Sequence, residues 1–399
     1  MMRIVIAGGG LSALRSAENL RKRGYEGELT VVADERHLPY NRPPLSKEFL
    51  WGEATEDELA FGVPAEEAEI EWKVGHSVVA SNLDDKTLTL SNGETLTYDG
   101  LVAATGVSSR RLPIPGPQEG RIVLRSLDDA ISLKERLKPG ARLVCLGAGF
   151  IGCEVARTAR QVGCEVDIVA IDPVPMVVPL GREVGAEVQR RHEDAGVRFH
   201  MGQSIAEMLG GNRVEGVRLD DGTELPADFV LETVGSVPNI DWLSGNDLDL
   251  RNGVLTDAYL RCGAKPGVVA VGDVARFANP LFAADPLRIE HWQTAIDTTV
   301  FATATLMADL GLTHERPEPV SIMPWFWSDQ GTVRMTSYGM LGIADSTEVV
   351  EGELNGECAV SYLRDGQPVG ILLIGTEIKQ RGARFKRQLA KARKEASAI

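Results

Sequence analysis

The chain has 399 residues, of which 43% are hydrophobic and 25% charged, and its formal net charge at pH 7 is -15. This length predicts two or three domains, and the composition is typical of a soluble globular protein. The acidic balance disfavours general nucleic-acid binding, and no apolar run approaches the roughly 18 residues that a membrane helix needs.

The cysteines and the first residues indicate a reducing compartment. The chain has 5 cysteines, none in C-x-x-C spacing. This pattern argues against a disulfide framework, structural zinc, an iron–sulfur cluster or any other metal site. The N-terminus reads as a strand that contains Arg3, not as a signal peptide, so we expect a cytoplasmic protein.

A glycine turn opens the chain. An apolar strand at residues 3–7 runs into Gly8-x-Gly10, and Ala13 holds the third position before a helical stretch at 14–23. In such a turn the first glycine gives backbone freedom and the second lets a pyrophosphate come close. The phosphates then meet the free N–H groups of the helix N-terminus.

A second copy of this turn lies further along. Apolar residues 144–146 lead into Gly147-x-Gly149-x-x-Gly152, and residues 154–161 read as a helix. One such string is equally compatible with an ordinary turn. Two copies in one chain predict two dinucleotides held face to face, the layout of a flavoprotein that takes electrons from a nicotinamide.

After the first turn, residues 29–33 read as a second strand that Asp34 and Glu35 follow. An acid about 20 residues beyond such a turn commonly binds the ribose hydroxyls of an adenine dinucleotide. We favour Glu35 for this contact over Asp34. A solvated loop acid is the alternative.

Residues 39–47 read P-Y-N-R-P-P-L-S-K. The prolines exclude a helix interior or a central strand, so the segment is expected to be rigid and extended. It presents Arg42 and Lys47, which can neutralise a pyrophosphate and stabilise an anionic reduced flavin. The alternative is a pair of surface charges after a proline loop.

This segment and the two glycine turns resemble the oxygenase-coupled NAD(P)H:ferredoxin reductases, a family of FAD enzymes. The family's hallmark near the flavin is P-Y-x-R-P-P-L-S-K, which residues 39–47 match throughout. The resemblance implies an α/β, glutathione-reductase-like flavoprotein with two Rossmann-like dinucleotide-binding domains and a C-terminal α+β domain. The expected boundaries are 1–115 and 241–316 for a discontinuous FAD domain, 116–240 for the NAD(P) domain and 317–399 for the C-terminal domain.

A thiol relay from the flavin is disfavoured. Glutathione-reductase-like enzymes carry a redox-active C-x-x-x-x-C after the second strand, but no cysteine precedes Cys145 here. A flavin-facing disulfide needs a pair of cysteines in contact.

The resemblance also implies where the chain meets FAD. Residues 104–106 match the family's A-T-G turn, and Asp273, at the end of a strand, is expected to bind the ribityl hydroxyls. Arg110 falls where the family has a further FAD contact, but the usual R-P before it is S-S at 108–109, which leaves that contact open. The predicted FAD-binding residues are Gly8, Gly10, Leu11, Ser12, Ala13, Asp34, Glu35, Arg42, Lys47, Val78, Ala104, Thr105, Gly106, Arg110, Gly272, Asp273, Glu290, His291, Trp292 and Trp327.

Two further motifs concern the flavin ring. Residues 288–292 resemble the family's R-x-E-H-W, which opens a helix against the isoalloxazine. We assign His291 no chemistry, because a packed or capping histidine explains it equally well. Residues 324–330 match P-W-F-W-S-D-Q, which implies that Trp327 lies near the flavin edge. An ordinary core aromatic is the alternative.

Glu154 gives the sharpest inference about catalysis. It stands two residues beyond Gly152, where a carboxylate is favoured by the helix dipole. In the family the matching glutamate pairs, across the domain interface, with the lysine of P-L-S-K beside the flavin N5. We therefore expect a Glu154–Lys47 pair that gates nicotinamide stacking, so the predicted catalytic residues are Lys47, Glu154 and Trp327.

The choice between NADH and NADPH depends on the second nucleotide domain. The family's NADH-selecting glutamate is replaced by Ala170, Asp172 lies two residues on, and no arginine stands between Ala170 and Gly181 to hold a 2′-phosphate. We favour NADH. The predicted nicotinamide-nucleotide residues are Gly147, Gly149, Phe150, Ile151, Gly152, Glu154, Asp172 and Gly235.

The resulting hypothesis is an FAD-dependent NAD(P)H reductase that passes single electrons to a [2Fe–2S] ferredoxin of a P450 or ring-hydroxylating oxygenase. We expect a monomer or weak dimer. The basic tail, residues 379–394, is either a solvated amphipathic helix or an electrostatic dock for an acidic ferredoxin. Alternative functions are a rubredoxin or monodehydroascorbate reductase, an NADH oxidase of the same fold, and a redox-sensing binding protein like the apoptosis-inducing factor.

Overall fold

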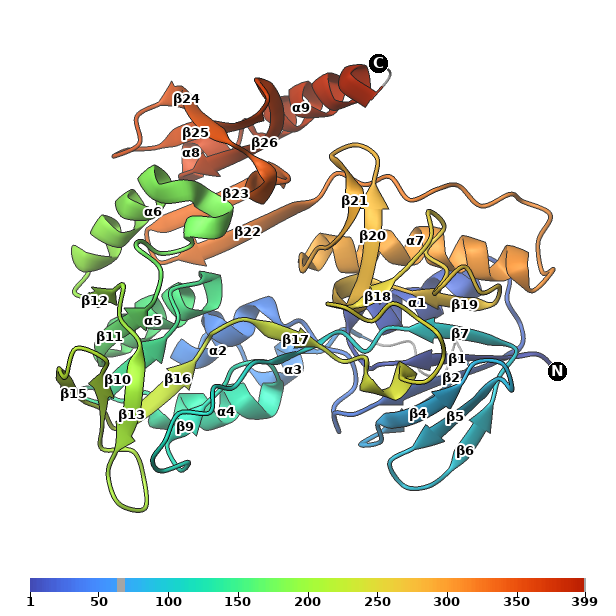
Figure 1. The fold of residues 1–399 in the computed structure, drawn as a ribbon, viewed down its shortest axis with the longest axis horizontal. Coiled ribbons are helices and arrows are strands. Elements are labelled where there is room, and N and C mark those ends of the chain that lie inside the picture. Colours follow the sequence, from blue (N-terminus) through green and yellow to red (C-terminus); the bar gives the residue numbers. More distant parts are fainter. Residues whose placement is uncertain (63–68, 398–399) are drawn as a thin grey trace. The chain divides into compact units, whose positions relative to one another are not determined.

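The computed structural model describes residues 1–62 and 69–397, and its internal contacts divide the chain into two units (Figure 1). Unit 1 comprises Met1–Asn41, Ala60–Ser108 and Val237–Phe326. Unit 2 comprises Arg42–Leu59, Ser109–Ser236 and Trp327–Ile399. The three predicted domain boundaries stay a prediction.

Unit 1 is built on a five-stranded sheet with the order β19-β7-β1-β2-β3, in which all neighbouring strands are parallel. Its central strand is an apolar run whose Ile4, Val5 and Ile6 are fully buried, as expected for a parallel sheet covered on both faces. The helices α1 and α7 pack against each other beside this sheet (Figure 1). The bounds are β1 Arg3–Ala7, α1 Leu11–Lys22, β2 Glu28–Ala33, β3 Ile70–Val74, β7 Gly100–Ala103, β19 Val268–Ala270 and α7 Trp292–Asp309.

Two smaller sheets complete unit 1. The antiparallel sheet β4-β5-β6 contains a hairpin around Asn92-Gly93, a typical hairpin turn pair, where Gly93 has a φ of 86°. The other sheet has the order β18-β20-β21. The bounds are β4 Val78–Asn82, β5 Thr87–Leu90, β6 Thr95–Thr97, η2 Asp241–Leu243, β18 Val254–Leu255, η3 Gly272–Val274, β20 Ala275–Asn279 and β21 Ala283–Arg288.

Unit 2 repeats the plan of unit 1 with a parallel sheet of the order β12-β11-β10-β16-β9. Its central strand β10 leads into α5, which packs on β10 and β11. A three-stranded antiparallel sheet, β13-β14-β15, is added to it. The bounds are β9 Arg121–Ile122, α4 Leu127–Arg136, β10 Arg142–Leu146, α5 Phe150–Val162, β11 Glu165–Ala170, α6 Val177–Glu193, β12 Arg198–Met201, β13 Ile205–Leu209, β14 Gly216–Leu219, β15 Glu224–Pro226 and β16 Phe229–Glu232.

The C-terminal part forms an antiparallel sheet of the order β22-β23-β26-β25-β24. Helix α9 packs on it through the buried side chains of Phe385 and Leu389. The bounds are β22 Trp325–Gln330, β23 Val333–Gly339, η4 Leu341–Ile343, β24 Ser346–Gly352, β25 Cys358–Arg364, β26 Gln367–Ile374, α8 Thr376–Lys379 and α9 Gly382–Ser397. Two short strands, β8 and β17, span Val107–Ser109 and Ser236–Pro238.

The predicted fold class is confirmed, and the differences concern boundaries. Helix α5 begins at Phe150, directly after the N-cap Gly149, and not at Glu154. The proline-rich segment is not wholly extended, because Pro43–Ser46 forms the 3₁₀ helix η1. Proline suits the first turn of a helix, since its φ is already fixed and no N–H is needed there. The short helices α2 Glu48–Trp51 and α3 Glu56–Leu59 follow.

No helix among the described residues is both long and apolar enough to cross a membrane.

Candidate active site

The first glycine turn lies at the carboxyl end of β1 in unit 1. Gly8 has a φ of 126°, and a Cβ on it would lie 2.1 Å from the carbonyl oxygen of Ala104. Only glycine fits, and the turn is thereby held against the A-T-G segment that follows β7. The predicted residues Gly10 and Leu11 are the N-cap and the first residue of α1.

Predicted FAD residues that follow three other strands of unit 1 lie at the same edge of the sheet. Glu35 follows β2, Thr105 follows β7, and Asp273 follows β19. Because these strands and β1 are parallel, their carboxyl ends share one edge, where ligands of open α/β sheets bind. Val78 is different, since it begins β4 in a separate sheet.

Two of these residues have partners that the sequence did not reveal. The hydroxyl of Tyr40 donates a 2.5 Å hydrogen bond to Oε2 of Glu35, which fixes that carboxylate at the end of β2. The hydroxyl of Ser12 donates to the carbonyl oxygen of Ala295 at 3.0 Å, so it joins α1 to α7. A direct hydrogen bond from this hydroxyl to a phosphate is not what the geometry favours.

The R-x-E-H-W segment packs as a helix start. Arg288 forms a 2.6 Å ion pair with Glu290, and His291 is the N-cap of α7, whose first residue is Trp292. The imidazole ring lies 5.1 Å from the ring of Phe326, and burial lowers the pKa of His291 to about 4. This neutral, packed ring gives no reason to assign proton transfer to it.

The second glycine turn, in unit 2, shows three different environments for its glycines. Gly147 has a φ of 105°, and a Cβ on it would lie 2.4 Å from the carbonyl oxygen of Thr233. A Cβ on Gly152 would lie 2.4 Å from the carbonyl oxygen of Gly147, whereas one on Gly149 would meet no atom within 4 Å. These are the environments of a tight turn, a close helix–strand contact and an open approach to a pyrophosphate.

The remaining predicted nicotinamide residues lie at the same edge. Asp172 follows β11 and Gly235 follows β16, and both strands flank β10 in parallel. Ala170, at the selective position, is buried at the end of β11, while the side chain of Asp172 is exposed. The exposed predicted residue Ile151 lies in the first turn of α5.

Lys47 and Glu154 form a buried ion pair inside unit 2. Their side chains meet at 2.7 Å, from Nζ to Oε2, and the residues are only 6% and 4% exposed. Ser46 donates a 2.5 Å hydrogen bond to the same carboxylate oxygen, and Ser328 donates one of 2.6 Å to Oε1. Both oxygens of a carboxylate that lies out of water are therefore satisfied, as such a charge requires.

Local structure explains how these side chains meet. The tight contact at Gly152 fixes the start of α5, and Glu154 and Thr158 are four residues apart on one face of that helix. Thr158 donates its hydroxyl to the carbonyl oxygen of Ser46 at 2.9 Å, which holds the end of η1 over α5. The sequence implied the pair but missed Ser46 and Ser328, although both lie inside quoted motifs.

The other predicted cations have partners within unit 2. Arg42 donates to the carbonyl oxygen of Arg125 at 2.6 Å. The backbone N–H of Arg110 donates to the carbonyl oxygen of Gly235 at 3.0 Å, and its guanidinium to that of Ser236 at 3.2 Å. Trp327, next to Ser328 on β22, is half-buried.

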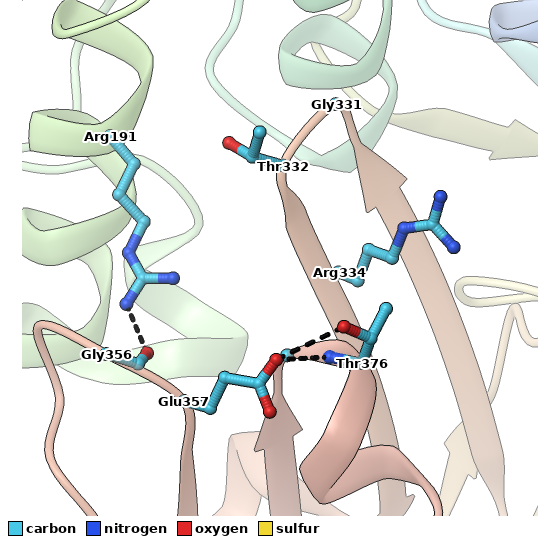
Figure 2. A pocket seen from close by; sticks show the side chains of 8 residues that line it. Arg191, Gly331, Thr332, Arg334, Gly356, Glu357 and Thr376 are labelled. Atoms are coloured by element: carbon cyan, nitrogen blue, oxygen red, sulfur yellow. Dashed lines mark hydrogen bonds between the residues drawn. The ribbon is translucent and has the colours of Figure 1, made fainter.

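Unit 2 also has a pocket of about 540 Å³, and none of the predicted site residues lines it (Figure 2). Within it Arg191 donates to the carbonyl oxygen of Gly356 at 2.6 Å, and Glu357 accepts the backbone N–H of Thr376 at 2.8 Å. Because no residue of either glycine turn lines it, this pocket is distinct from the candidate cofactor sites.

The cysteines are all buried and unbridged. Burial raises the pKa of Cys262 to about 12 and also raises the pKa of the other thiols. A thiol in such surroundings stays protonated and inert. Within the part of the chain that the structure describes, no group of three or more histidine, cysteine or acidic side chains is placed to hold a metal ion.

Comparison with known proteins identifies the family. Residues 2–299 match the family model described as pyridine nucleotide-disulphide oxidoreductase, and residues 325–398 match that of the reductase C-terminal domain. The chain belongs to the pyridine nucleotide-disulphide oxidoreductase family. It is therefore an oxidoreductase, and the resemblance found in its sequence is confirmed.

Individual members of this family are similar over almost the whole chain. The ferredoxin–NAD(+) reductase component of the p-cumate 2,3-dioxygenase system of Pseudomonas putida is 35% identical, over 89% of this chain and 85% of that protein. Rhodocoxin reductase of Rhodococcus erythropolis is 34% identical, over 89% and 82%. The crystal structure of the covalent putidaredoxin reductase–putidaredoxin complex superimposes with a TM-score of 0.91 at 30% identity, covering 98% of this chain and 93% of that chain.

The environments of Gly149 and Gly152 predict that the same substitution affects nucleotide binding at Gly149 and stability at Gly152. In Gly149→Ala the methyl group enters open space, so the melting temperature should stay within about 2 °C of wild type while the KM for NADH rises roughly tenfold or more. In Gly152→Ala the methyl group overlaps a carbonyl oxygen, so stability should fall by about 1–3 kcal/mol. Thermal unfolding and steady-state kinetics of both variants measure this. Equal melting temperatures for the two would contradict the assignment.

Proposed function

We propose that this oxidoreductase binds FAD in unit 1 and NAD(P)H in unit 2, and passes electrons from NAD(P)H to a [2Fe–2S] ferredoxin that serves a P450 or a ring-hydroxylating oxygenase. The observation that carries the proposal is the repeated arrangement, a glycine turn with its following helix at the carboxyl edge of each parallel sheet. The names of the relatives, which are reductase components of oxygenase systems, support the choice of acceptor.

The residues of unit 1 fit an FAD. The N-terminus of α1 would offer backbone N–H groups to the pyrophosphate, and Glu35, held by Tyr40, would accept hydrogen bonds from the adenosine ribose. Asp273, in η3 just after β19, would accept hydrogen bonds from the ribityl hydroxyls. When bound, FAD supplies the chemistry of accepting a hydride and releasing electrons one at a time.

The residues of unit 2 fit a nicotinamide dinucleotide. Gly149 leaves room for its pyrophosphate, and the N-terminus of α5 faces it. NADH is the proposed donor, because Asp172 is the acid nearest to the selective position and would repel a 2′-phosphate. The Lys47–Glu154 pair and Trp327 are proposed to border the flavin, where Lys47 holds positive charge and Glu154 keeps its ammonium in place.

The proposed acceptor is tested by an acceptor series. Purified protein with NADH should reduce cytochrome c rapidly only when a [2Fe–2S] ferredoxin is added, and the kcat/KM for NADH should exceed that for NADPH. Equal or faster turnover with rubredoxin, monodehydroascorbate or oxygen would favour the alternative reductases. A reduced flavin that persists with every acceptor would instead favour the redox-sensing binding protein. The cytoplasmic location and the monomeric or weakly dimeric state also stay predictions.

The role of Lys47 is tested by removing its charge. Lys47→Met leaves the buried carboxylate of Glu154 without its cation, which commonly costs about 3–5 kcal/mol of stability. Lys47→Met/Glu154→Gln should recover most of that loss but not the rate of flavin reduction by NADH. Stopped-flow absorbance and urea unfolding measure both effects. The control is Lys138→Met, an exposed lysine of the same unit, and a double variant with the wild-type reduction rate would refute the role.

The basic face of α9 is the proposed ferredoxin dock. Arg387, Lys391 and Lys394 are exposed and lie at i, i+4 and i+7, on one face of the helix, away from the buried Phe385 and Leu389. Arg384 precedes them but already forms a 2.5 Å ion pair with Glu351, and Lys391 has a longer contact of 3.9 Å with Glu395. A positive stripe on a protein of net charge -15 suits an acidic partner at this position.

Charge reversal tests the dock. Arg387→Glu/Lys391→Glu should raise the KM for ferredoxin several-fold at low salt, leave the KM for NADH unchanged, and lose its effect as salt screens the contact. Lys22→Glu/Lys138→Glu is the control, since it makes the same change in net charge at exposed lysines elsewhere. If both double variants bind ferredoxin like the wild type at low salt, α9 is only a solvated helix.

A further inference from the structure

A chain of buried polar side chains continues from the ion pair into the interior of unit 2. Ser328, which donates to Glu154, accepts a 3.1 Å hydrogen bond from Nε2 of Gln330. Oε1 of Gln330 in turn lies 2.7 Å from Nε2 of His192. Ser328 is 1% exposed, and Gln330 and His192 are fully buried. This series of hydrogen bonds therefore runs from α6 through β22 to the start of α5 in the buried interior.

Each member of this chain has a fixed donor or acceptor role. An amide oxygen only accepts, so the proton of His192 must be on Nε2. Burial lowers the pKa of His192 to about 4, which keeps the ring neutral, and its Nδ1 has no hydrogen-bond partner among the described residues. The amide nitrogen of Gln330 faces Ser328 and the sulfur of Met176. From His192 through Gln330 and Ser328, each side chain therefore donates one hydrogen bond in the direction of Glu154, while Gln330 also donates to Met176.

This direction has an electrostatic consequence. Ser328 and Gln330 are two residues apart on β22, so they lie on the same face of the strand. Aligned hydrogen bonds in a dry interior strengthen one another, and a hydrogen bond to the ionised form of a carboxylate lowers its proton affinity. This series of hydrogen bonds therefore stabilises the charge of Glu154 through Oε1, whereas Lys47 contacts Oε2.

We propose that Ser328, Gln330 and His192 are positioning residues that keep Glu154 ionised and its Oε2 directed at the ammonium of Lys47. The inference rests on the proposed function, in which that ammonium must stay beside the flavin. An arrangement that merely filled space would not need donors aligned along its whole length. Apolar side chains at these places would pack at lower cost, because buried polar groups must be fully paired to be tolerated.

The test removes one link at a time. Ser328→Ala deletes the hydroxyl next to Glu154, and Gln330→Leu removes, at similar volume, the hydrogen bonds of the central link to His192, Ser328 and Met176. Ser337→Ala is the matched control, because Ser337 is a fully buried serine of the neighbouring strand β23 whose hydroxyl has no hydrogen-bond partner among the described residues. Ser328→Thr keeps the hydroxyl and should restore the wild-type behaviour. If Gln330→Leu does not fold, Ser328→Ala, which loses one oxygen, decides.

Two readouts separate positioning from a structural role. The first readout is the rate of flavin reduction by saturating NADH, measured by stopped flow across a pH series. As the pH is lowered, the rate of Ser328→Ala and Gln330→Leu should begin to fall at a higher pH than that of wild type. The apparent pKa of this acidic limb should rise by about one unit, a tenfold change in proton affinity. An equilibrium redox titration, between the wild-type and variant values of that pKa, should give a more positive midpoint potential of the bound FAD. The reason is that protonation removes a negative charge beside Lys47.

The failures of the two proposals are distinguishable. If the wild-type protein is reduced by NADH but both variants give the pH profile and potential of wild type and Ser337→Ala, the positioning role is refuted and the proposed function stands. If the wild-type protein binds no FAD, or its FAD is not reduced by NADH, the proposed function is refuted, and this inference with it.

Discussion

A carboxylate that lies almost entirely out of water needs a fixed partner for its charge, and the surroundings of Glu154 are organised around this need. Lys47 supplies the counter-charge, while Ser46 and Ser328 each donate a hydrogen bond to one of the carboxylate oxygens. These groups come from η1 and its C-cap residue, from α5 and from β22, which are distant in sequence. Since breaking one member of such a set leaves a buried charge uncompensated, the ion pair ties the position of these elements to one another.

The two parallel sheets explain why the candidate residues gather where they do. A parallel strand must leave the sheet at its carboxyl end, and a glycine turn allows it to enter a helix there at once. Both units use this device, at Gly8 and at Gly147, where a carbonyl oxygen occupies the place that a Cβ would take. The repeated edge explains how one chain can offer two dinucleotide sites. The two units differ at the start of the helix, because α5 carries Glu154 just after its glycine turn and α1 carries no glutamate there.

Much of this could be predicted from the sequence, because short-range physics decides it. The glycine turns, the strands before them and the hairpin at Asn92-Gly93 depend on residues that are neighbours in the chain. The ion pair of Lys47 and Glu154 was implied by a family resemblance and could not be derived from spacing. His192 was missed, because nothing near it in sequence indicates that its ring meets Gln330. Tyr40 stood inside a quoted motif, but its contact with Glu35 depends on how the chain turns after β2.

The central proposal is that the protein binds FAD and that a nicotinamide dinucleotide reduces it. The most direct measurement is anaerobic stopped-flow mixing of the purified protein with NADH, followed at the flavin absorbance. The account predicts a yellow protein that loses its colour in a fast phase and regains it when oxidised ferredoxin is added. A colourless protein that does not take up FAD on reconstitution, or a yellow one that stays oxidised under excess NADH and NADPH, would contradict it.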